Sequence, residues 1–233
     1  MAYVQGVLGE MKICIVIPVH DEAEHIGAVL DALKKKNYDI LVVDDGSHDS
    51  SGAIAKGKGI AVLTHEKRSG KGTSLRDGFR YAIEHDYDGV IAMDGDGQHA
   101  VDDVAAFLQK AEEVPDCVIV GSRMKNHEGM PALRFAVNKI MSLLISLLCR
   151  HRIEDTQCGF RFISTKVLKE INLASLDYEI ESEVLMKAVK KGFPIFSVPV
   201  KTIYSNEQSK INPLTDTLRF FRYIVREAWN SKP

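Results

Sequence analysis

Two carboxylates one residue apart, Asp94 and Asp96, stand in the stretch DGDGQH at residues 94–99, directly after an apolar run. Carboxylates this close raise one another's pKa unless a cation lies between them, and a hard divalent ion with oxygen ligands is the usual cation. Mg²⁺ binds few protein ligands and takes the others from water and substrate phosphates. The spacing therefore predicts Mg²⁺ or Mn²⁺ bound together with a diphosphate, and two successive tight Asp-Gly turns are the structural alternative.

A second acidic pair, Asp44 and Asp45, begins the stretch DDGSHDSS. One carboxylate is sufficient to cap the helix that follows. The other is suited to accept hydrogen bonds from the N–H of a base or from a ribose hydroxyl, so the pair indicates a nucleotide. Further along, Lys67, Arg68 and Lys71 stand among glycines ahead of a helix N-terminus, a setting that favours phosphate. Taken alone, that basic loop favours a solvated turn.

Short β-branched runs alternate with amphipathic stretches around these motifs, which is the pattern of βα units on a parallel sheet. The predicted strands are residues 13–19, 40–43, 60–64, 90–93, 117–120, 160–164 and 195–200. The predicted helices are residues 22–36, 71–85, 101–113, 133–149, 179–191 and 214–229, and Asp49 or Ser50 can cap a further helix after the second strand. Ligands of open α/β sheets bind at the carboxyl ends of the strands, where the polar clusters at residues 20–22, 44–47 and 94–96 all stand. One crevice is predicted to collect them.

The chain has 233 residues and a formal net charge of −2. With no linker or internal repeat, it is predicted to form one domain over residues 1–233, and its charge gives no bulk signal for nucleic acid. The four cysteines are widely spaced without any C-x-x-C pair, which argues against a zinc site or a disulfide framework and favours a reducing cytoplasm. No secretion signal is expected, and the longest uncharged apolar run, residues 140–149, is too short to span a bilayer.

Six motifs occur in order along the chain: VIPVHDEAEHI, LVVDDGSHDSS, GKGTSLRDGF, AMDGDGQH, GSR at residues 121–123 and EDTQCGFR at residues 154–161. Together they resemble family-two glycosyltransferases of the GT-A fold, particularly the polyprenyl-phosphate (dolichyl-phosphate) mannosyl- and glucosyltransferases. The resemblance implies a Rossmann-like α/β sandwich with a central, mostly parallel sheet flanked by helices. It also implies a nucleotide-sugar-binding half over residues 11–121 and an acceptor-binding half with amphipathic helices over residues 122–233.

The resemblance assigns roles to the residues that match the family's motifs. With Lys71 of the basic loop added, the expected donor-binding residues are Pro18, His20, Asp21, Glu22, Asp45, Lys71, Asp94 and Gly95. The expected metal ligands are Asp94, Asp96 and Gln98, and the acceptor phosphate is assigned to Arg123 and Arg134. Asp96 and Arg123 are expected to be catalytic, with Asp155 as general base if the acceptor is a sugar hydroxyl and as a plain turn residue otherwise. Asp21 stands where the family commonly has Asn, and His99 where it often has Pro.

The resemblance further implies transfer of a hexose, mannose or glucose, from a GDP- or UDP-linked donor to polyprenyl phosphate in a single inverting displacement. A diphosphate that leaves against Mg²⁺ or Mn²⁺ needs no proton, and a lipid phosphate is already an anionic nucleophile. A sugar-hydroxyl acceptor is the nearest alternative. A sugar-1-phosphate nucleotidylyltransferase is disfavoured because no glycine follows the first strand before Gly27. A non-catalytic nucleotide-binding or membrane-scaffold protein would not need a metal motif.

A lipid acceptor predicts a membrane-facing surface, and two stretches qualify. One helical face of residues 133–149 carries Leu133, Val137, Ile140, Leu144 and Leu147, flanked by Arg134, Lys139 and Arg150. Burial in the core is the alternative for this stripe. The predicted C-terminal helix places Leu218, Phe221 and Val225 beside Arg219, Arg222 and Arg226, and the segment before it, with Ser209 and Lys210, is expected to close over the donor or acceptor. These features predict a cytoplasmic protein with peripheral contact at the cytoplasmic membrane face.

Overall fold

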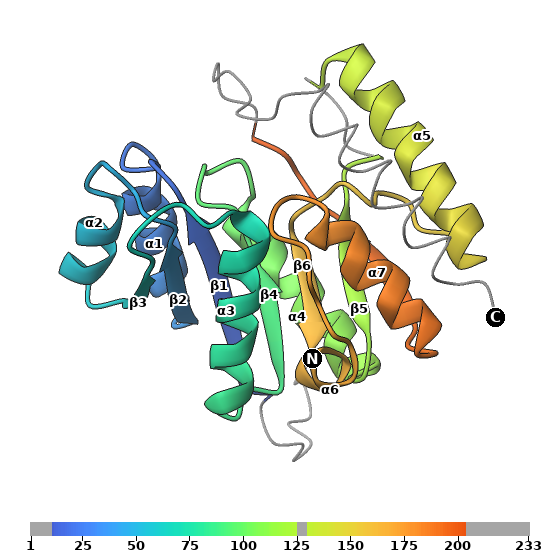
Figure 1. Ribbon diagram of the computed structural model, residues 1–233, viewed down its shortest axis with the longest axis horizontal. Helices are drawn as coiled ribbons and strands as arrows, with labels where there is room; N and C mark the ends of the chain where they lie inside the picture. The colour runs from blue at the N-terminus through green and yellow to red at the C-terminus, as the bar shows by residue number, and fades with distance from the viewer. Residues whose placement is uncertain (1–10, 125–129, 204–233) are drawn as a thin grey trace, which may run out of the picture.

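The computed structural model describes residues 11–124 and 130–203, which form a seven-stranded sheet covered by helices on both faces (Figure 1). The strand order is β3-β2-β1-β4-β6-β5-β7. Strand β6 runs antiparallel to β4 and β5, and the remaining pairs of this sheet are parallel. The strands are β1 (Ile13–Val19), β2 (Asp39–Asp44), β3 (Ala61–Thr64), β4 (Gly89–Ala92), β5 (Val118–Ser122), β6 (Arg161–Ser164) and β7 (Ile195–Pro199). The predicted mostly parallel α/β architecture is confirmed.

Helices α1 and α4 lie behind the sheet in the view of Figure 1, α3 and α7 lie in front of it, and α5 lies apart at the upper right. The helices are α1 (Ile26–Lys34), α2 (Ser51–Gly57), α3 (Lys71–Glu84), α4 (Val104–Glu113), α5 (Ala132–Cys149), α6 (Thr165–Glu170) and α7 (Ile180–Lys190), with a 3₁₀ turn η1 (Val101–Asp103) before α4. Helix α6 was not predicted from the sequence pattern. The predicted helix over residues 214–229 and the segment with Ser209 and Lys210 lie outside the described residues.

The central strands are buried on both faces, as expected for parallel strands covered by helices, and Ile15, Val16 and Ile17 of β1 are at most 1% exposed. Helix α3 packs closely on β1 because Gly78 has no side chain: a Cβ there would lie 2.3 Å from Val16 Cγ1. This close packing carries Lys71, the first residue of α3, to the edge of the sheet where the parallel strands end.

Helix α1 begins at Ile26, four residues later than the pattern predicted. Asp21 has a φ of 54°, in the left-handed region, so the chain turns directly after β1. The N–H groups of Glu22 and Ala23 then donate to Ser51 Oγ and Asp49 Oδ2 at 2.8 and 2.9 Å. These tertiary hydrogen bonds hold the β1–α1 loop against the β2–α2 loop, and the helix starts only beyond them.

The expectation that a carboxylate of the 44–45 pair caps α2 is wrong. Asp44 Oδ1 accepts the N–H of Ser47 at 3.0 Å, and Asp45 binds the loop before α3. The N–H of Ser51, the first residue of α2, donates instead to Asp49 Oδ1 at 2.8 Å. Asp49 is one of the two caps that the sequence predicts for this helix. Asp44 Oδ2 lies beside the first turn of α2, 2.2 Å from where a Cβ on Gly52 would stand, but its Oδ1 closes the turn at Ser47.

Helix α5 exposes apolar side chains, so core burial, the alternative for its apolar stripe, is wrong for most of it. Among the described residues, the exposed apolar side chains of α5 are Leu133, Val137, Ile140, Leu143, Leu147 and Leu148. Leu144 is half-buried, whereas Met141 and Ile145 pack inward. The 18-residue helix is long and apolar enough to cross a membrane by length and composition, with 22% of it buried, although residues 140–149 alone are too short.

Candidate active site

The carboxyl ends of β1 and β4 form the topological switch point of the sheet, since the chain runs from β1 towards β2 on one side and returns to β4 on the other. The loop after β4 packs against the end of β1: a Cβ on Gly95 would lie 2.8 Å from Val19 Cγ1. The pairing of β4 with β1 ends at Val16, before Pro18. The residues that follow β1, predicted to bind the donor, therefore stand at the same edge of the sheet as Asp94.

Lys71 joins three elements at this edge. Its Nζ lies 2.7 Å from Asp94 Oδ1 after β4 and 2.8 Å from Glu181 Oε1 of α7. Arg161 Nη2 of β6 lies 3.7 Å from Glu181 Oε2, and a Cβ on Gly159 would lie 2.9 Å from Asp94 Oδ2. Burial opposes the charge of Asp94, but the charge of Lys71 outweighs it and holds the pKa of Asp94 well below its usual range. Asp94 is therefore ionised at neutral pH.

The remainder of the DGDGQH loop is a turn that packs on the buried ring of His99. Asp96 Oδ1 accepts the N–H of Gln98 at 2.9 Å. His99 is buried, its Nδ1 accepts the N–H of Asp94 at 3.2 Å, and its ring stacks on Phe160 with centroids 4.9 Å apart. Burial lowers the pKa of His99, which agrees with an unprotonated, accepting Nδ1. His99, one of the two positions at which the chain departs from the family pattern, is thus a packing residue of the loop.

The ligand atoms that this loop offers fit a hard divalent cation. Asp94, Asp96 and Gln98 offer carboxylate and amide oxygens, which Mg²⁺ and Mn²⁺ prefer, and the ionised state of Asp94 suits ligation. The argument from the sequence, in which a divalent cation allows Asp94 and Asp96 to lie close together, is nonetheless incomplete. Lys71 already compensates Asp94, so the acidic pair is tolerated in part by a lysine that stands 23 positions earlier in the chain.

Asp45 organises the basic loop before α3. Its Oδ1 accepts the N–H of Ser69 at 2.7 Å and its Oδ2 that of Gly70 at 2.9 Å. His65 lies between two carboxylates, with Nδ1 2.8 Å from Asp45 Oδ1 and Nε2 3.0 Å from Asp77 Oδ2. Burial opposes protonation of His65, but Asp45 and Asp77 outweigh it and raise its pKa. The contact of Asp45 with a nucleotide base stays a prediction; the structure shows it holding the loop that ends at Lys71.

Arg123 and Asp155 form a buried, bidentate ion pair. Arg123 Nε donates to Asp155 Oδ2 at 2.7 Å and Nη2 to Oδ1 at 2.9 Å, and the N–H of Arg123 also donates to Oδ2 at 3.2 Å. Asp155 is fully buried. Arg134, the other arginine predicted to hold the acceptor phosphate, is half-buried in the first turn of α5.

A chain of polar contacts connects α5 to this site. Ser142 Oγ of α5 accepts the N–H of Thr156 at 2.9 Å, and the carbonyl of Thr156 accepts Arg161 Nη2 at 2.8 Å. Arg161 in turn lies against Glu181, which pairs with Lys71. Helix α5 is therefore connected to the DGDGQH loop by a chain of contacts between side chains that are mostly buried.

Sequence reasoning missed three contributors to the site. His65 could have been found, since it follows the third strand at the same sheet edge as the acidic pair. Arg161 was quoted within a motif and given no role. No local signal distinguishes Glu181 from other acidic residues near a helix start, and its partner Lys71 is 110 positions away.

Comparison with known proteins agrees with this geometry. The model of the family described as "Glycosyl transferase family 2" matches residues 14–171. A relative named UDP-N-acetylglucosamine–dolichyl-phosphate N-acetylglucosaminyltransferase, from Methanococcus voltae, is 32% identical over 221 residues, covering 85% of this chain and 88% of the relative. The polyprenol monophosphomannose synthase of Mycolicibacterium smegmatis is 27% identical over 200 residues, covering 80% and 75%.

Solved structures show the same fold. Mannosyl-3-phosphoglycerate synthase from Rubrobacter xylanophilus superimposes with a TM-score of 0.72 at 17% identity, covering 96% of this chain and 76% of that one. Glucosyl-3-phosphoglycerate synthase from Mycobacterium tuberculosis, in complex with Mn²⁺, UDP and phosphoglyceric acid, gives 0.70 at 19% identity, covering 93% and 76%. Together with the family match over more than half its length, these likenesses show that the chain belongs to glycosyl transferase family 2 and has the GT-A fold.

Proposed function

We propose that this chain is an inverting glycosyltransferase that transfers a hexose, mannose or glucose, from a nucleotide diphosphate sugar to polyprenyl phosphate. The observation that carries the proposal is the exposed apolar face of α5 on a member of this family. The names of the relatives from M. voltae and M. smegmatis, which refer to dolichyl phosphate and polyprenol, support the same class of acceptor.

The apolar face of α5 is suited to a lipid. Leu133 and Leu147, one near each end of the helix, are 77% and 65% exposed. Phe135, Ala136, Lys139, Ile140 and Leu143 line a shallow, open surface on the helix. An amphipathic helix with cationic side chains at its edges lies in the plane of a bilayer interface, with its apolar face among the acyl chains. We propose that α5 lies on the cytoplasmic membrane face in this way and receives the polyprenyl chain.

Departure of the nucleotide diphosphate is the step that the carboxylate loop would assist. Mg²⁺ or Mn²⁺ held by Asp94, Asp96 and Gln98 would supply positive charge to the leaving diphosphate. Lys71 adds a fixed positive charge at the same edge. Asp45 holds the loop before α3 through the N–H groups of Ser69 and Gly70, which keeps Lys71 at this edge of the sheet. These groups would orient the donor, with Pro18, His20, Asp21 and Glu22 along the nucleotide.

On the acceptor side, Arg134 and Arg123 would hold the lipid phosphate. Asp155 accepts three hydrogen bonds from Arg123, and both of its carboxylate oxygens are engaged in them. We therefore assign Asp155 to position Arg123 rather than to abstract a proton. A lipid phosphate needs no general base, so this assignment agrees with the proposed acceptor.

The proposal is tested with radiolabelled donors and a short-chain polyprenyl phosphate. The assay uses GDP-mannose, UDP-glucose and UDP-N-acetylglucosamine in parallel, each with Mn²⁺ or Mg²⁺, because the named relatives include both mannosyl and N-acetylglucosaminyl transferases. Transfer of label into an organic-extractable product supports the proposal. Label transferred only to a sugar or glycolipid hydroxyl would replace it with the alternative acceptor class.

The role of α5 is tested separately with Leu147→Gln. We expect this variant to bind vesicles and long-chain acceptor less well and to retain its unfolding midpoint, because the side chain is already in water in the free protein. The matched control is Leu176→Gln, which removes a similarly exposed leucine, 59% exposed, from the segment before α7 that contacts the start of α3. Equal loss of vesicle binding in both variants would show that α5 is not the contact surface.

A further inference from the structure

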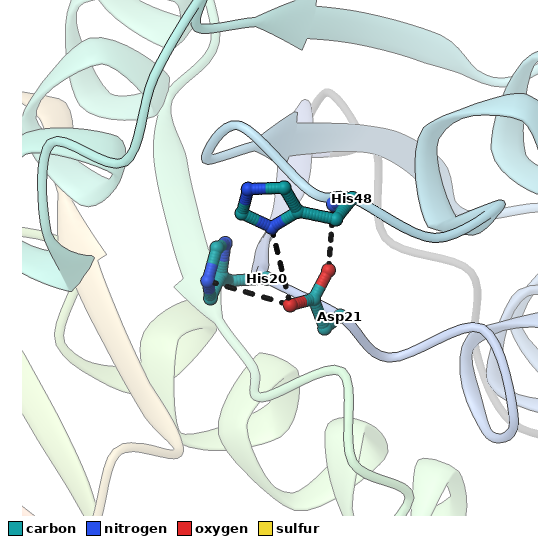
Figure 2. A group of neighbouring side chains, drawn as sticks. All are labelled: His20, Asp21 and His48. Carbon is teal, nitrogen blue, oxygen red and sulfur yellow. Dashed lines mark hydrogen bonds and ion pairs between the residues drawn. The ribbon is translucent and has the colours of Figure 1, made fainter.

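Two histidines and an aspartate meet where the β1–α1 and β2–α2 loops touch (Figure 2). Asp21 Oδ2 lies 3.6 Å from His20 Nε2 and 3.6 Å from His48 Nδ1. The three ligand atoms all lie within 4.8 Å of one another. Around a tetrahedral Zn²⁺ with bonds of about 2.0–2.2 Å, ligand atoms are separated by about 3.4 Å. The two distances from Asp21 Oδ2 already match this spacing, and the two ring nitrogens, within 4.8 Å of each other, would approach further on binding.

The carboxylate of this cluster is held from behind. Asp21 Oδ1 accepts the N–H of His48 at 2.7 Å and that of Asp49 at 3.3 Å, and Figure 2 shows the other oxygen, Oδ2, directed between the two rings. The left-handed φ of Asp21 turns the chain so that this side chain meets the β2–α2 loop. One oxygen therefore fixes the carboxylate, and the other points at both imidazoles.

The tautomer of His20 is also determined by its surroundings. Its Nδ1 lies 2.9 Å from the carbonyl oxygen of Asp45, which can only accept, so Nδ1 carries the proton. In the neutral ring Nε2 then has a lone pair, and it is Nε2 that lies near Asp21 Oδ2. At 3.6 Å, these two atoms are spaced as two ligands of one metal ion are. An Nδ1–H to carbonyl hydrogen bond is also the usual outer contact of a histidine that ligates metal through Nε2.

We propose that His20, Asp21 and His48 form a binding site for Zn²⁺, separate from the Asp94–Asp96 loop. Two imidazoles with one carboxylate favour Zn²⁺ and related transition ions over Mg²⁺, which takes oxygen ligands. The side chain of His48 is 85% exposed, so the site opens to solvent and leaves a fourth position for water or a ligand oxygen. Although His20 and Asp21 are also proposed to line the nucleotide, binding of Zn²⁺ in the absence of a donor does not depend on the proposed sugar transfer.

The test is calorimetric titration of the full chain with Zn²⁺ at neutral pH in excess Mg²⁺, which keeps the Asp94–Asp96 loop occupied by the harder ion. We expect one Zn²⁺ per chain and at least about 10-fold weaker binding in both His48→Gln and His20→Gln. The visible absorption of Co²⁺ added in place of Zn²⁺ gives a second readout, because its intensity separates tetrahedral from octahedral coordination. Substitution of the exposed His48 should leave the fold intact.

Two control variants separate this site from others. His85→Gln removes a histidine at the far end of α3, whose Nδ1 bonds the carbonyl of Tyr81, and should bind Zn²⁺ as the parent does. Asp96→Asn should also retain Zn²⁺ while losing sugar transfer, so a failed transfer assay would not count against the zinc site. Absence of stoichiometric Zn²⁺ binding to the parent, or unchanged affinity in both His20→Gln and His48→Gln, would overturn the proposal.

Discussion

Lys71 Nζ lies 2.7 Å from Asp94 Oδ1, so the first acid of the DGDGQH loop has a permanent cationic partner from the start of α3. The same ammonium group lies 2.8 Å from Glu181, which ties α3, the β4 loop and α7 together at one point. Asp94 is consequently ionised before any divalent ion binds. The loop is thereby prepared for a metal by a structural ion pair.

Replacement of Lys71, whose ammonium group lies between Asp94 and Glu181, should therefore lower both the stability and the activity of the protein. Lys71→Met leaves two largely buried carboxylates without their shared partner, and the loss of one member of such a pair costs about 3 kcal/mol of unfolding free energy. Denaturant titration measures this cost. Lys67→Met, at an exposed position of the same loop, should change stability by less than about 0.5 kcal/mol. Equal losses of unfolding free energy in the two variants would mean that the ion pairs of Lys71 stabilise the protein no more than an exposed lysine does.

Asp96 should matter for the metal and little for the fold, because its side chain makes only a turn contact to Gln98 among the hydrogen bonds described. We expect Asp96→Asn to lower sugar transfer at least about 100-fold and to abolish the thermal stabilisation by nucleotide diphosphate with Mn²⁺. Chelation of divalent ions should reproduce the loss in the parent protein. Asp102→Asn, on η1, is the matched control, and full turnover in Asp96→Asn would remove the metal assignment.

His65 predicts a pH dependence of stability. Its folded pKa is raised by Asp45 and Asp77, so its stabilisation is complete below the unfolded value of about 6.5 and is lost as pH rises through the folded value. The unfolding free energy of the parent should thus fall more steeply than that of His65→Gln as the pH is raised from mildly acidic to alkaline. Parallel profiles for the two proteins would contradict a paired imidazolium.

Asp155 provides a test of positioning against base catalysis. Asp155→Asn breaks a fully buried ion pair and should cost about 3–5 kcal/mol of stability, leaving Arg123 without its carboxylate. The double variant Arg123→Met with Asp155→Leu should recover part of that loss, because both charges are gone. Glu154→Gln, next in sequence, is the control. If Asp155→Asn instead kept full stability and lost only kcat with a changed pH profile, a general base would be indicated.

The spacing between α3 and β1 should tolerate no added methyl group. Gly78→Ala would place a Cβ 2.3 Å from Val16 Cγ1, and overpacking of this kind costs about 1–3 kcal/mol. Gly57→Ala at the end of α2 meets nothing within 4 Å and should be neutral or stabilising by about 0.5–1 kcal/mol. Thermal unfolding of the two variants makes the comparison, and similar midpoints would show that α3 can move away from the sheet.

Local features of the chain were sufficient for the order of elements and for the position of the polar clusters. A strand or helix reveals itself through periodicity over a few turns, and the residues directly after a parallel strand necessarily stand at its carboxyl end. For that reason Asp94, Asp96 and Asp45 were placed at one sheet edge without a structure. The start of α1 was misplaced, because hydrogen bonds from Glu22 and Ala23 to another loop prevail over helix propensity there.

Only the tertiary structure decided which partners these side chains take and which faces are covered. Lys71 meets Glu181 across 110 positions, and Arg123 meets Asp155 across 32, since packing of α7 and of the 153–156 loop brings them together. The apolar stripe of α5 obeys the same period whether it faces a core or a membrane, so its exposure depends on what the rest of the chain packs against. Periodicity specifies a face of an element, whereas contacts depend on the relative placement of elements, which short-range pattern does not encode.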